Sequence, residues 1–356
     1  MSRYMSSRYS SLTPYTPGEQ PVGRKYIKLN TNESPFPPSE RVLKAVSDEV
    51  GLLNLYPEPE CRKLCSLTAQ LLGVDESQIL MTNGSDEILN FAFAAFGDGE
   101  NPFAFPDITY GFYPVFAELN RIPYKTIPLK DGFAIDPDDY KNIGMNIVIA
   151  NPNAPTGLVL SVSQIEEIVK SNPGHVVIID EAYIDFGGES CVKLVNRYEN
   201  LLVTRTFSKS YSLAGARLGF GVGCRALIED LNTIKYSTNP YNINRMTMAA
   251  GIAAIEDVQY YSDKCKTITD NREILKKKLS ELGFSVTDSK ANFVFAKHPE
   301  ISGQDFYLKL KEAGILVRHF SIPEITDYNR ITVGTAEQTD ALLCAAESII
   351  KGDKFQ

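Results

Sequence analysis

The sequence has no tryptophan, only three histidines and only six cysteines among its 356 residues. The histidines, His175, His298 and His319, stand far apart, and no pair of cysteines has the C-x-x-C spacing typical of a zinc site. Six scattered cysteines are also too few for a disulfide scaffold. We therefore expect no metal site, and we expect the cysteines to be reduced thiols.

Long apolar segments are missing too. The longest runs, such as residues 91–96, fall far below the ~18 residues needed to cross a bilayer. The first twenty residues contain arginines and prolines and lack the apolar core of a secretory signal. The formal net charge of −8 argues against nucleic acid or an anionic membrane as the main partner. The sequence therefore predicts a cytoplasmic protein without membrane or nucleic-acid partners.

What the sequence does contain is a regular alternation of short apolar segments and helical patterns between about residues 40 and 235. Several of the apolar segments are continuous, as in strands that helices cover on both faces. This alternation predicts a three-layer α/β/α domain with a mostly parallel sheet. The clearest strand candidates are Ile79–Thr82, Asn146–Ala150, Val176–Asp180, Leu201–Thr204 and Leu218–Val222.

The last third of the chain predicts a second, smaller α/β domain. A long helical pattern covers about residues 240–282, and strand candidates follow at 292–296, 315–319 and 330–333. The first forty residues, rich in serine, proline and tyrosine, are expected to form an extended arm that helps complete this domain. We expect the arm and part of the small domain in residues 1–45, the large domain in residues 46–245 and the small domain in residues 246–356.

The most specific motif follows the strand that ends near Thr204. Its turn carries the hydroxyls of Thr206 and Ser208, then Lys209, and eight residues later Arg217. Hydroxyls and a guanidinium group suit a phosphate dianion. A lysine amine beside them can form a Schiff base with an aldehyde. Together these residues indicate a binding site for pyridoxal 5′-phosphate.

A second motif places a carboxylate at the end of another strand. The apolar segment before Asp180 predicts a buried strand, and open α/β sheets bind ligands at this carboxyl edge. A carboxylate there can pair with a protonated pyridine nitrogen and make the ring an electron sink. Tyr183 is close enough in sequence to reach the phenolic oxygen of the same ring. An Asp-Glu pair after a strand can also bind Mg²⁺, but the sequence has no phosphate loop of the G-x-x-x-x-G-K-[ST] type.

Three glycine-containing segments are less specific. Gly84, Ser85 and Asp86 precede a helical pattern, where N–H groups can bind phosphate or the residues can simply cap the helix. The turn 151–157 can present the amide of Asn153 to a ligand or serve only as a turn. The G-x-G-x-G run at 219–223 lacks the spacing of a dinucleotide fingerprint, so we expect no NAD site there.

These motifs occur together, in this order, in one family. From about Leu12 to its C-terminus the chain resembles the fold-type I aminotransferases of class I/II, which depend on pyridoxal phosphate, and among them the histidinol-phosphate aminotransferases. The resemblance implies their fold: a three-layer large domain and a smaller α/β domain. Further support comes from Leu12-Thr-Pro-Tyr15, Leu29-Asn-Thr-Asn32-Glu33, Leu55-Tyr56-Pro57, Pro240-Tyr-Asn242, Val317-Arg318 and Asn329-Arg330-Ile-Thr-Val-Gly334.

The resemblance implies a role for each cofactor residue. Lys209 binds the cofactor covalently and then moves protons, Asp180 holds the pyridinium nitrogen, and Tyr183 bonds the ring oxygen O3′. Tyr110 stacks on the ring. Tyr56 reaches the cofactor phosphate of a neighbouring subunit, so a homodimer is implied. The phosphate is held by Gly84, Ser85, Asp86, Thr206, Ser208 and Arg217.

The resemblance also implies a substrate, and at one position this chain departs from the pattern of the family. Arg330 binds the α-carboxylate of glutamate, Arg318 and Tyr15 help bind the phosphate of histidinol phosphate, and Asn32 belongs to the substrate site. Alternatively, either arginine can simply form an ion pair with an acidic residue on the surface. Related enzymes carry a second asparagine where this chain has Ala154, so Asn153 or Tyr183 must supply the contact to O3′.

We therefore expect transfer of the amino group of L-histidinol phosphate to 2-oxoglutarate, in histidine biosynthesis. Two alternatives share the predicted cofactor site: an aromatic amino-acid aminotransferase, and a lyase similar to threonine-phosphate decarboxylase, which releases carbon dioxide and needs no oxo acid. We do not expect a cofactor-sensing transcription regulator, because the roughly 40 residues before the first helix cannot hold a winged helix and the net charge is negative.

Overall fold

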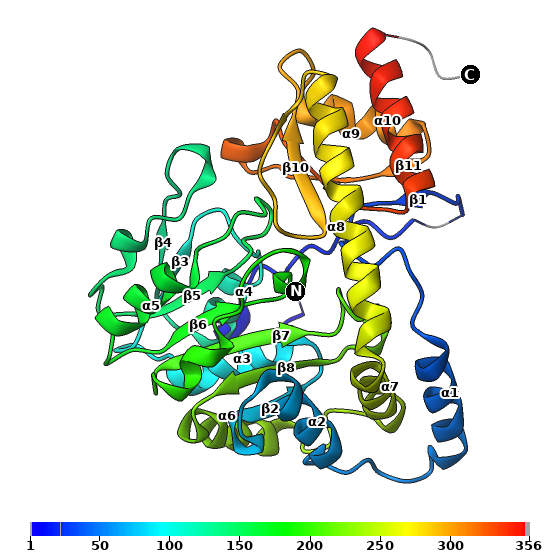
Figure 1. Ribbon diagram of the computed structural model, residues 1–356. Coiled ribbons are helices and arrows are strands. Elements are labelled where there is room, and N and C mark those ends of the chain that lie inside the picture. The colour runs from blue at the N-terminus through cyan, green and yellow to red at the C-terminus, as the bar shows by residue number, and fades with distance from the viewer. Residues whose placement is uncertain (1, 22, 353–356) are drawn as a thin grey trace.

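A seven-stranded sheet forms the centre of the large domain (Figure 1). The computed structural model describes residues 2–21 and 23–352. The strand order is β2-β8-β7-β6-β5-β3-β4, and β8 runs antiparallel to both of its neighbours while the other pairs are parallel. The strands are β2 (Ile79–Thr82), β3 (Phe103–Pro106), β4 (Tyr124–Ile127), β5 (Asn146–Ala150), β6 (Val177–Asp180), β7 (Leu201–Thr206) and β8 (Gly219–Gly223).

Helices cover both faces of this sheet, which explains why most of its strands, apart from the edge strand β4, are buried along their length. Successive side chains of β5 point to opposite faces: Ile147 and Ile149 enter one apolar cluster, and Val148 and Ala150 enter the other. The prediction of a three-layer domain with a mostly parallel sheet is confirmed. The helices before the small domain are α1 (Glu40–Glu49), α2 (Arg62–Leu72), α3 (Ser85–Phe96), α4 (Tyr113–Asn120), α5 (Val162–Ser171), α6 (Arg225–Thr238) and α7 (Arg245–Glu256).

The small domain is built on a four-stranded antiparallel sheet with the order β12-β13-β10-β9. The N-terminal arm contributes β1, which pairs in parallel with β11. Its strands are β1 (Ile27–Lys28), β9 (Ser285–Val286), β10 (Phe293–Lys297), β11 (Ile315–Leu316), β12 (Arg318–His319) and β13 (Asn329–Thr332). Its helices are α8 (Val258–Glu281), α9 (Gly303–Glu312) and α10 (Ala336–Lys351).

Helix α8 joins the two domains. Near its start, Tyr261 packs in the core of the large domain, while Cys265 and later residues pack in the core of the small domain. We keep the division into arm, large domain and small domain as a proposal, and the two cores favour a boundary inside α8. Further along α8, Arg272 donates to the carbonyls of Phe186 and Ala291 and so ties the domains together.

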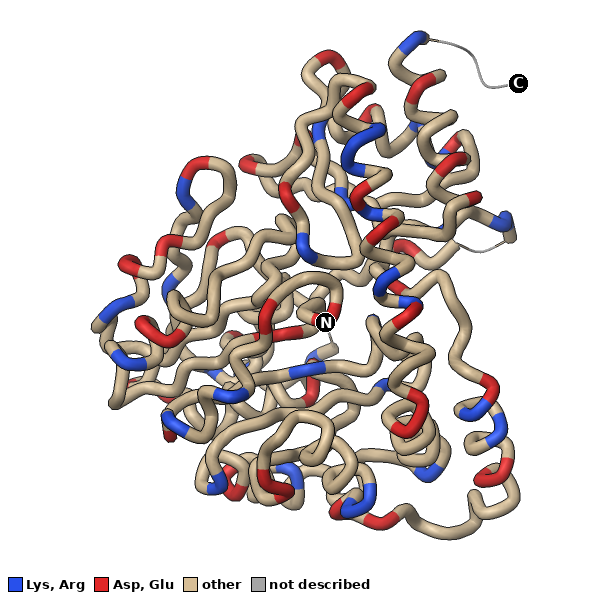
Figure 2. Tube along the Cα trace, viewed as in Figure 1, with Lys and Arg blue, Asp and Glu red and all other residues tan. Residues whose placement is uncertain are grey.

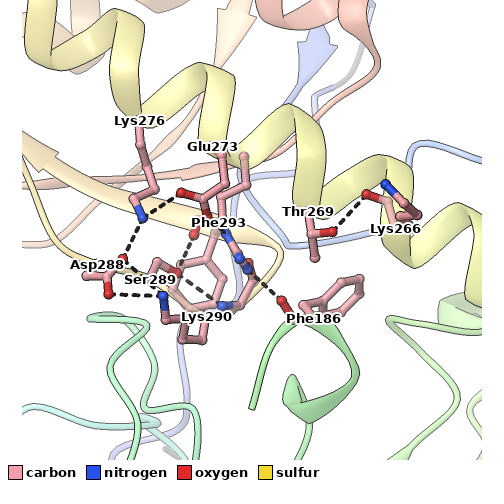
Figure 3. A network of polar contacts seen from close by, with 11 residues as sticks. Phe186, Lys266, Thr269, Glu273, Lys276, Asp288, Ser289, Lys290 and Phe293 are labelled. Atoms are coloured by element: carbon pink, nitrogen blue, oxygen red, sulfur yellow. Dashed lines mark hydrogen bonds and ion pairs between the residues drawn. The ribbon is translucent and has the colours of Figure 1, made fainter.

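An ion-pair network surrounds this junction (Figure 3). Lys276 on α8 pairs with Glu273 one turn away and with Asp288 on the loop before β10, and Asp288 also pairs with Lys290. All four side chains are at least partly exposed, so each pair adds only about 0–1 kcal/mol to stability. The network fixes the loop that precedes β10 against α8.

One strand prediction needs correction. The predicted strand 315–319 is divided, since Val317 separates β11 from β12 and the two pair in different sheets. The G-x-G-x-G run forms β8, where a Cβ on Gly219 would lie 2.5 Å from the backbone of Gly84 and one on Gly221 2.9 Å from Ile88. Small residues there let β8 approach the start of α3.

Charged residues of both signs are interspersed over the molecule, as along α1 and α8 (Figure 2). Within residues 2–21 and 23–352, no helix has the length and apolar character needed to cross a bilayer.

Candidate active site

A cavity of about 370 Å³ lies where the carboxyl ends of β6 and β7 meet the start of α3 and the small domain. This is the edge at which open α/β sheets bind ligands. Segments from the arm, the large domain and the small domain all contribute to its wall. The predicted site residues that line it are Tyr15, Asn32, Ser85, Asp86, Tyr110, Asp180, Tyr183, Thr206, Ser208, Lys209, Arg217, Arg318 and Arg330.

Lys209 reaches into this cavity from the turn after β7. Its Nζ donates to the backbone carbonyl of Thr31, at 3.2 Å. Burial, and then the nearby charge of Arg330, lower the pKa of Lys209 to about 8, against the opposing effect of Glu33. The amine is therefore far more often neutral near pH 7 than an exposed lysine, and a neutral amine is the form that attacks an aldehyde.

Asp180 ends β6 with both carboxylate oxygens held in place. Its Oδ2 accepts from the Tyr113 hydroxyl at 3.0 Å, and its Oδ1 accepts from Thr204 Oγ1 at 3.2 Å. Burial raises the pKa of Asp180 to about 6, although these donors act in the opposite direction. A cation placed opposite this buried carboxylate, such as a pyridinium, would favour its charged form.

A polar cradle at the start of α3 fits a phosphate group. Arg217 Nη1 contacts Ser208 Oγ at 3.4 Å, and Ser208 also accepts from Thr206 Oγ1 at 2.9 Å. The left-handed Gly84 (φ 76°) lies beside this guanidinium group, and a Cβ there would be only 2.6 Å from Arg217 Nη2. The N–H groups of the first turn of α3 lie at the same place. The cradle therefore has the donors and the space that a phosphate ester requires.

Aromatic side chains form one wall of the cavity. The Tyr110 hydroxyl donates to Asp86 Oδ1 at 2.7 Å, which fixes the ring beside the cradle. Its ring meets the ring of Tyr113 edge-on, with centroids 5.7 Å apart. From the arm, Tyr15 stacks on Phe112 at 4.2 Å. These contacts hold a flat aromatic surface where a planar ligand ring can stack.

Two arginines of the small domain bring positive charge to the cavity. Arg318 donates through Nη1 to the Pro17 carbonyl at 3.2 Å and through Nη2 to the Thr16 carbonyl at 3.3 Å. Arg330 Nη2 donates to the Asn30 carbonyl at 3.1 Å, and among the described residues nothing accepts from its buried Nε. Guanidinium groups in this arrangement suit a carboxylate or a phosphate.

Three predicted residues lie elsewhere or act differently. Asn153 is buried but turned away: its Oδ1 accepts from Thr109 and its Nδ2 donates to the Ile108 carbonyl. The amide thus ties the turn to the segment that follows β3, while Ala154 lines the cavity. Tyr56 is 78% exposed, stacks on Tyr241 and is not among the residues around the cavity. Asn32 lines the cavity and bonds Tyr183.

Sequence reasoning missed the residues that hold the site residues in position. Tyr113 and Thr204, which donate to Asp180, and Thr31, whose carbonyl accepts from Lys209, were not predicted. Thr204 and Asp180 are register partners on neighbouring strands, a relation that depends on the sheet order. No local signal could have found these partners, because the contacts join segments far apart in the sequence.

Comparison with known proteins identifies the family. The family model for aminotransferase class I and II matches residues 24–345. The chain belongs to the class I and II aminotransferases. A histidinol-phosphate aminotransferase from Brachyspira hyodysenteriae is 51% identical, covering 99% of this chain and 100% of its own length. Histidinol-phosphate aminotransferase 1 from Hydrogenovibrio crunogenus is 48% identical, covering 99% of both chains.

A solved structure agrees at the level of the fold. Histidinol-phosphate aminotransferase from Sinorhizobium meliloti, in complex with pyridoxal-5′-phosphate, superposes with a TM-score of 0.89 over 99% of each chain, at 22% identity. The predicted family and fold-type I architecture are thus confirmed. This aminotransferase uses pyridoxal phosphate, as predicted, and the cradle and the buried carboxylate described above fit that cofactor.

Proposed function

We propose that the protein catalyses transfer of the amino group of L-histidinol phosphate to 2-oxoglutarate, giving imidazole-acetol phosphate and L-glutamate, a step of histidine biosynthesis. The observation that carries this proposal is the pair Arg318 and Arg330, which line the same cavity as Lys209. Both substrates are anions, one a phosphate and the other a dicarboxylate, and both need guanidinium partners. The relatives at 51% and 48% identity carry the same name over nearly the whole chain.

In this proposal the side chains around the cavity have distinct tasks. When bound, pyridoxal phosphate supplies an electron sink for the substrate's Cα–H bond. Lys209 binds the cofactor and then carries the proton between substrate carbon and cofactor, a role that its lowered pKa favours. Asp180 keeps the ring nitrogen protonated, and Tyr183 donates to the ring oxygen. Ser85, Asp86, Thr206, Ser208 and Arg217 surround the phosphate, with Gly84 giving the space and Tyr110 covering the ring.

A single-turnover absorbance experiment tests the proposed substrate. L-histidinol phosphate is added to the cofactor-loaded enzyme without any oxo acid. We expect the visible band of the lysine-bound cofactor to disappear, and 2-oxoglutarate to restore it. Phenylalanine and threonine phosphate are the controls. If phenylalanine bleaches the band and histidinol phosphate does not, the substrate is wrong; carbon dioxide released from threonine phosphate would indicate the lyase.

Replacing Arg330 with alanine is expected to lower kcat/KM for 2-oxoglutarate by about 30- to 1,000-fold, because a carboxylate loses a partly buried charged partner. Steady-state kinetics with each substrate varied in turn would measure the change. The exposed Arg225 on α6, paired with Glu229, gives a matched control whose replacement should leave the kinetics unchanged. Equal losses in both variants would contradict a binding role for Arg330.

We also propose a homodimer in which Tyr56 completes the site of the neighbouring subunit. The ring of Tyr56 is exposed, and it does not line the cavity of its own subunit. It is surrounded in sequence by the exposed apolar side chains of Leu52, Leu53 and Leu55, and Leu43 is exposed on α1. Exposed apolar side chains gathered in this way favour a protein interface.

Mixing two inactive variants tests this arrangement. If Tyr56 acts on the neighbouring site, a mixture of Tyr56→Ala and Lys209→Ala subunits forms mixed dimers with one complete site each. About a quarter of the wild-type activity should then return after random exchange, since half of the dimers are mixed. Light scattering should give twice 39.5 kDa. A mixture that stays as inactive as its parents would contradict the proposal.

The predicted cytoplasmic location fits an enzyme of amino-acid biosynthesis, and we retain it as part of the proposal. Fractionation of cells that express the tagged chain would test it, with the enzyme expected in the cytosolic fraction.

A further inference from the structure

The hydroxyl of Tyr183 has a fixed neighbour that the sequence assigned to another task. Asn32 Nδ2 lies 3.0 Å from Tyr183 Oη, and both residues line the cavity. Asn32 is 1% exposed and Tyr183 9% exposed, so water does not substitute for this contact. Ala154, which also lines the cavity, offers no polar side chain, and the amide of Asn153 bonds Thr109 and the Ile108 carbonyl.

The orientation of the Asn32 amide follows from its second partner, Thr332. The backbone N–H of Asn32 donates to Thr332 Oγ1 at 3.0 Å, and the Thr332 hydroxyl donates to Asn32 Oδ1 at 3.0 Å. With Oδ1 accepting, the opposite end of the amide is a donor, and Tyr183 Oη must accept from it. The proton of Tyr183 is therefore directed elsewhere.

Asn32 itself is held rigidly between the two domains. Its backbone carbonyl accepts from Asn292 Nδ2 at 2.9 Å, and its φ of 55° lies in the left-handed region, which asparagine tolerates better than most residues. Thr332 belongs to β13, while Tyr183 follows β6 of the large domain. The ring of Tyr183 also meets Phe293 of β10 edge-on, at 5.1 Å. The tyrosine is thus fixed at both its ring and its hydroxyl.

We propose that Asn32 is a positioning residue for Tyr183: the chain Thr332–Asn32–Tyr183 directs the tyrosine proton into the cavity, toward the ring oxygen of the bound cofactor. This rests on pyridoxal phosphate occupying the cavity. Through Tyr183, Asn32 of the N-terminal arm thus acts on the ring oxygen, which the apolar side chain of Ala154 cannot do. The chain also joins β13, which carries Arg330, to the cofactor side of the cavity.

The charges around Tyr183 allow its hydroxyl to stay protonated. Burial raises the pKa of Tyr183, and the charges of Asp180 and Asp86 act in the same direction, against Arg330 and the bond from Asn32. The Nζ of Lys209 lies 5.9 Å from the centroid of the tyrosine ring. A protonated phenol next to an anionic oxygen is a donor, and donating lowers the basicity of that oxygen.

The test follows the absorbance of the bound cofactor as pH is varied, a measurement that needs no turnover. Asn32→Gly removes the amide and still accepts the positive φ. Because the ring oxygen loses an oriented donor, it should hold its proton to a higher pH. The pH at which the visible absorbance band is half converted should rise by about 1 unit, which is a tenfold change in proton affinity. We call this pH the midpoint. Tyr183→Phe, which removes the donor itself, should shift the midpoint at least as far.

A second variant acts without touching Tyr183. Thr332→Val keeps the shape of the side chain but removes the hydroxyl that sets the amide of Asn32, so the midpoint should rise by about 0.5 pH unit. Thr339→Val is the matched control, because Thr339 is equally buried and its hydroxyl has no hydrogen-bond partner among the described residues. Its midpoint should equal that of the wild type.

The outcomes separate this inference from the proposed function. If Tyr183→Phe shifts the midpoint while Asn32→Gly and Thr332→Val both leave it unchanged, Tyr183 does not depend on Asn32 and the inference is wrong. If the wild-type protein shows no visible band with pyridoxal phosphate, the cofactor assignment itself fails. Adding Ala154→Asn to the Asn32→Gly variant should return the midpoint toward the wild-type value.

Discussion

Replacing Lys209 with alanine should abolish covalent attachment of the cofactor and lower the rate of transamination by roughly 10²- to 10⁴-fold. The amine is the group in the cavity that can attack an aldehyde, and its lowered pKa keeps it ready to do so. Borohydride reduction followed by mass spectrometry of the peptide that contains residue 209 would measure attachment. Lys235→Ala is the control, because this buried lysine donates to the Pro59 carbonyl, away from the cavity.

The same lysine predicts how cofactor capture depends on pH. A group with a pKa of about 8 is roughly one-tenth neutral at pH 7, compared with about one part in 3,000 at the ordinary value of 10.5. The rate of capture by the cofactor-free chain should therefore rise with pH and level off above about 8. A rate that keeps rising tenfold per pH unit up to 10 would show that Lys209 has an ordinary pKa.

Removing the charge of Asp180 is expected to have the second-largest effect. Asp180→Asn keeps the size of the side chain but leaves a buried pyridinium without its counter-charge. Breaking such a buried pair costs about 3–5 kcal/mol, which corresponds to roughly 10²- to 10⁴-fold in the rate of proton removal from the substrate. Stopped-flow absorbance after addition of histidinol phosphate would measure that rate.

The neighbouring carboxylate provides a close control. Glu181 is equally buried, but its oxygens accept from Ser190 Oγ and from the backbone N–H of Cys191, and its charge faces Arg205. Glu181→Gln should therefore change stability more than rate, as a melting curve recorded beside the kinetics would show. A similar loss of rate in both variants would mean that burial of charge, rather than contact with the cofactor, explains the effect.

The sequence predicted the large-domain sheet well where strands are apolar throughout. β2 and β5 begin and end where the patterns placed them. The strands β3 and β4 were not predicted, although all four residues of β3 are buried. Tyr124–Ile127 is mostly exposed at the edge of the sheet, so it carries no continuous apolar signal. The division of residues 315–319 could not be foreseen either, because β11 has its partner in the arm, nearly 290 residues earlier in the chain.

The site was predicted where a strand end and a specific chemistry coincide, as for Asp180 and Lys209. It was missed where the function of a residue depends on a distant partner. Asn153 was expected to present its amide to a ligand, yet the amide bonds Thr109 and the Ile108 carbonyl. Asn32 was assigned to the substrate because the sequence could not show that its amide meets Tyr183, 151 residues away.

Because β1 pairs with β11, one of the first strands to leave the ribosome has to wait for one of the last. Roughly 290 residues separate the two, so at about 5–20 residues per second the wait lasts about 15–60 s. The sheet of the large domain, complete at Gly223, can form during that time, but the small domain cannot close. Since Arg330 and the arm both line the cavity, a nascent chain acquires its complete cofactor site only at the end of its synthesis.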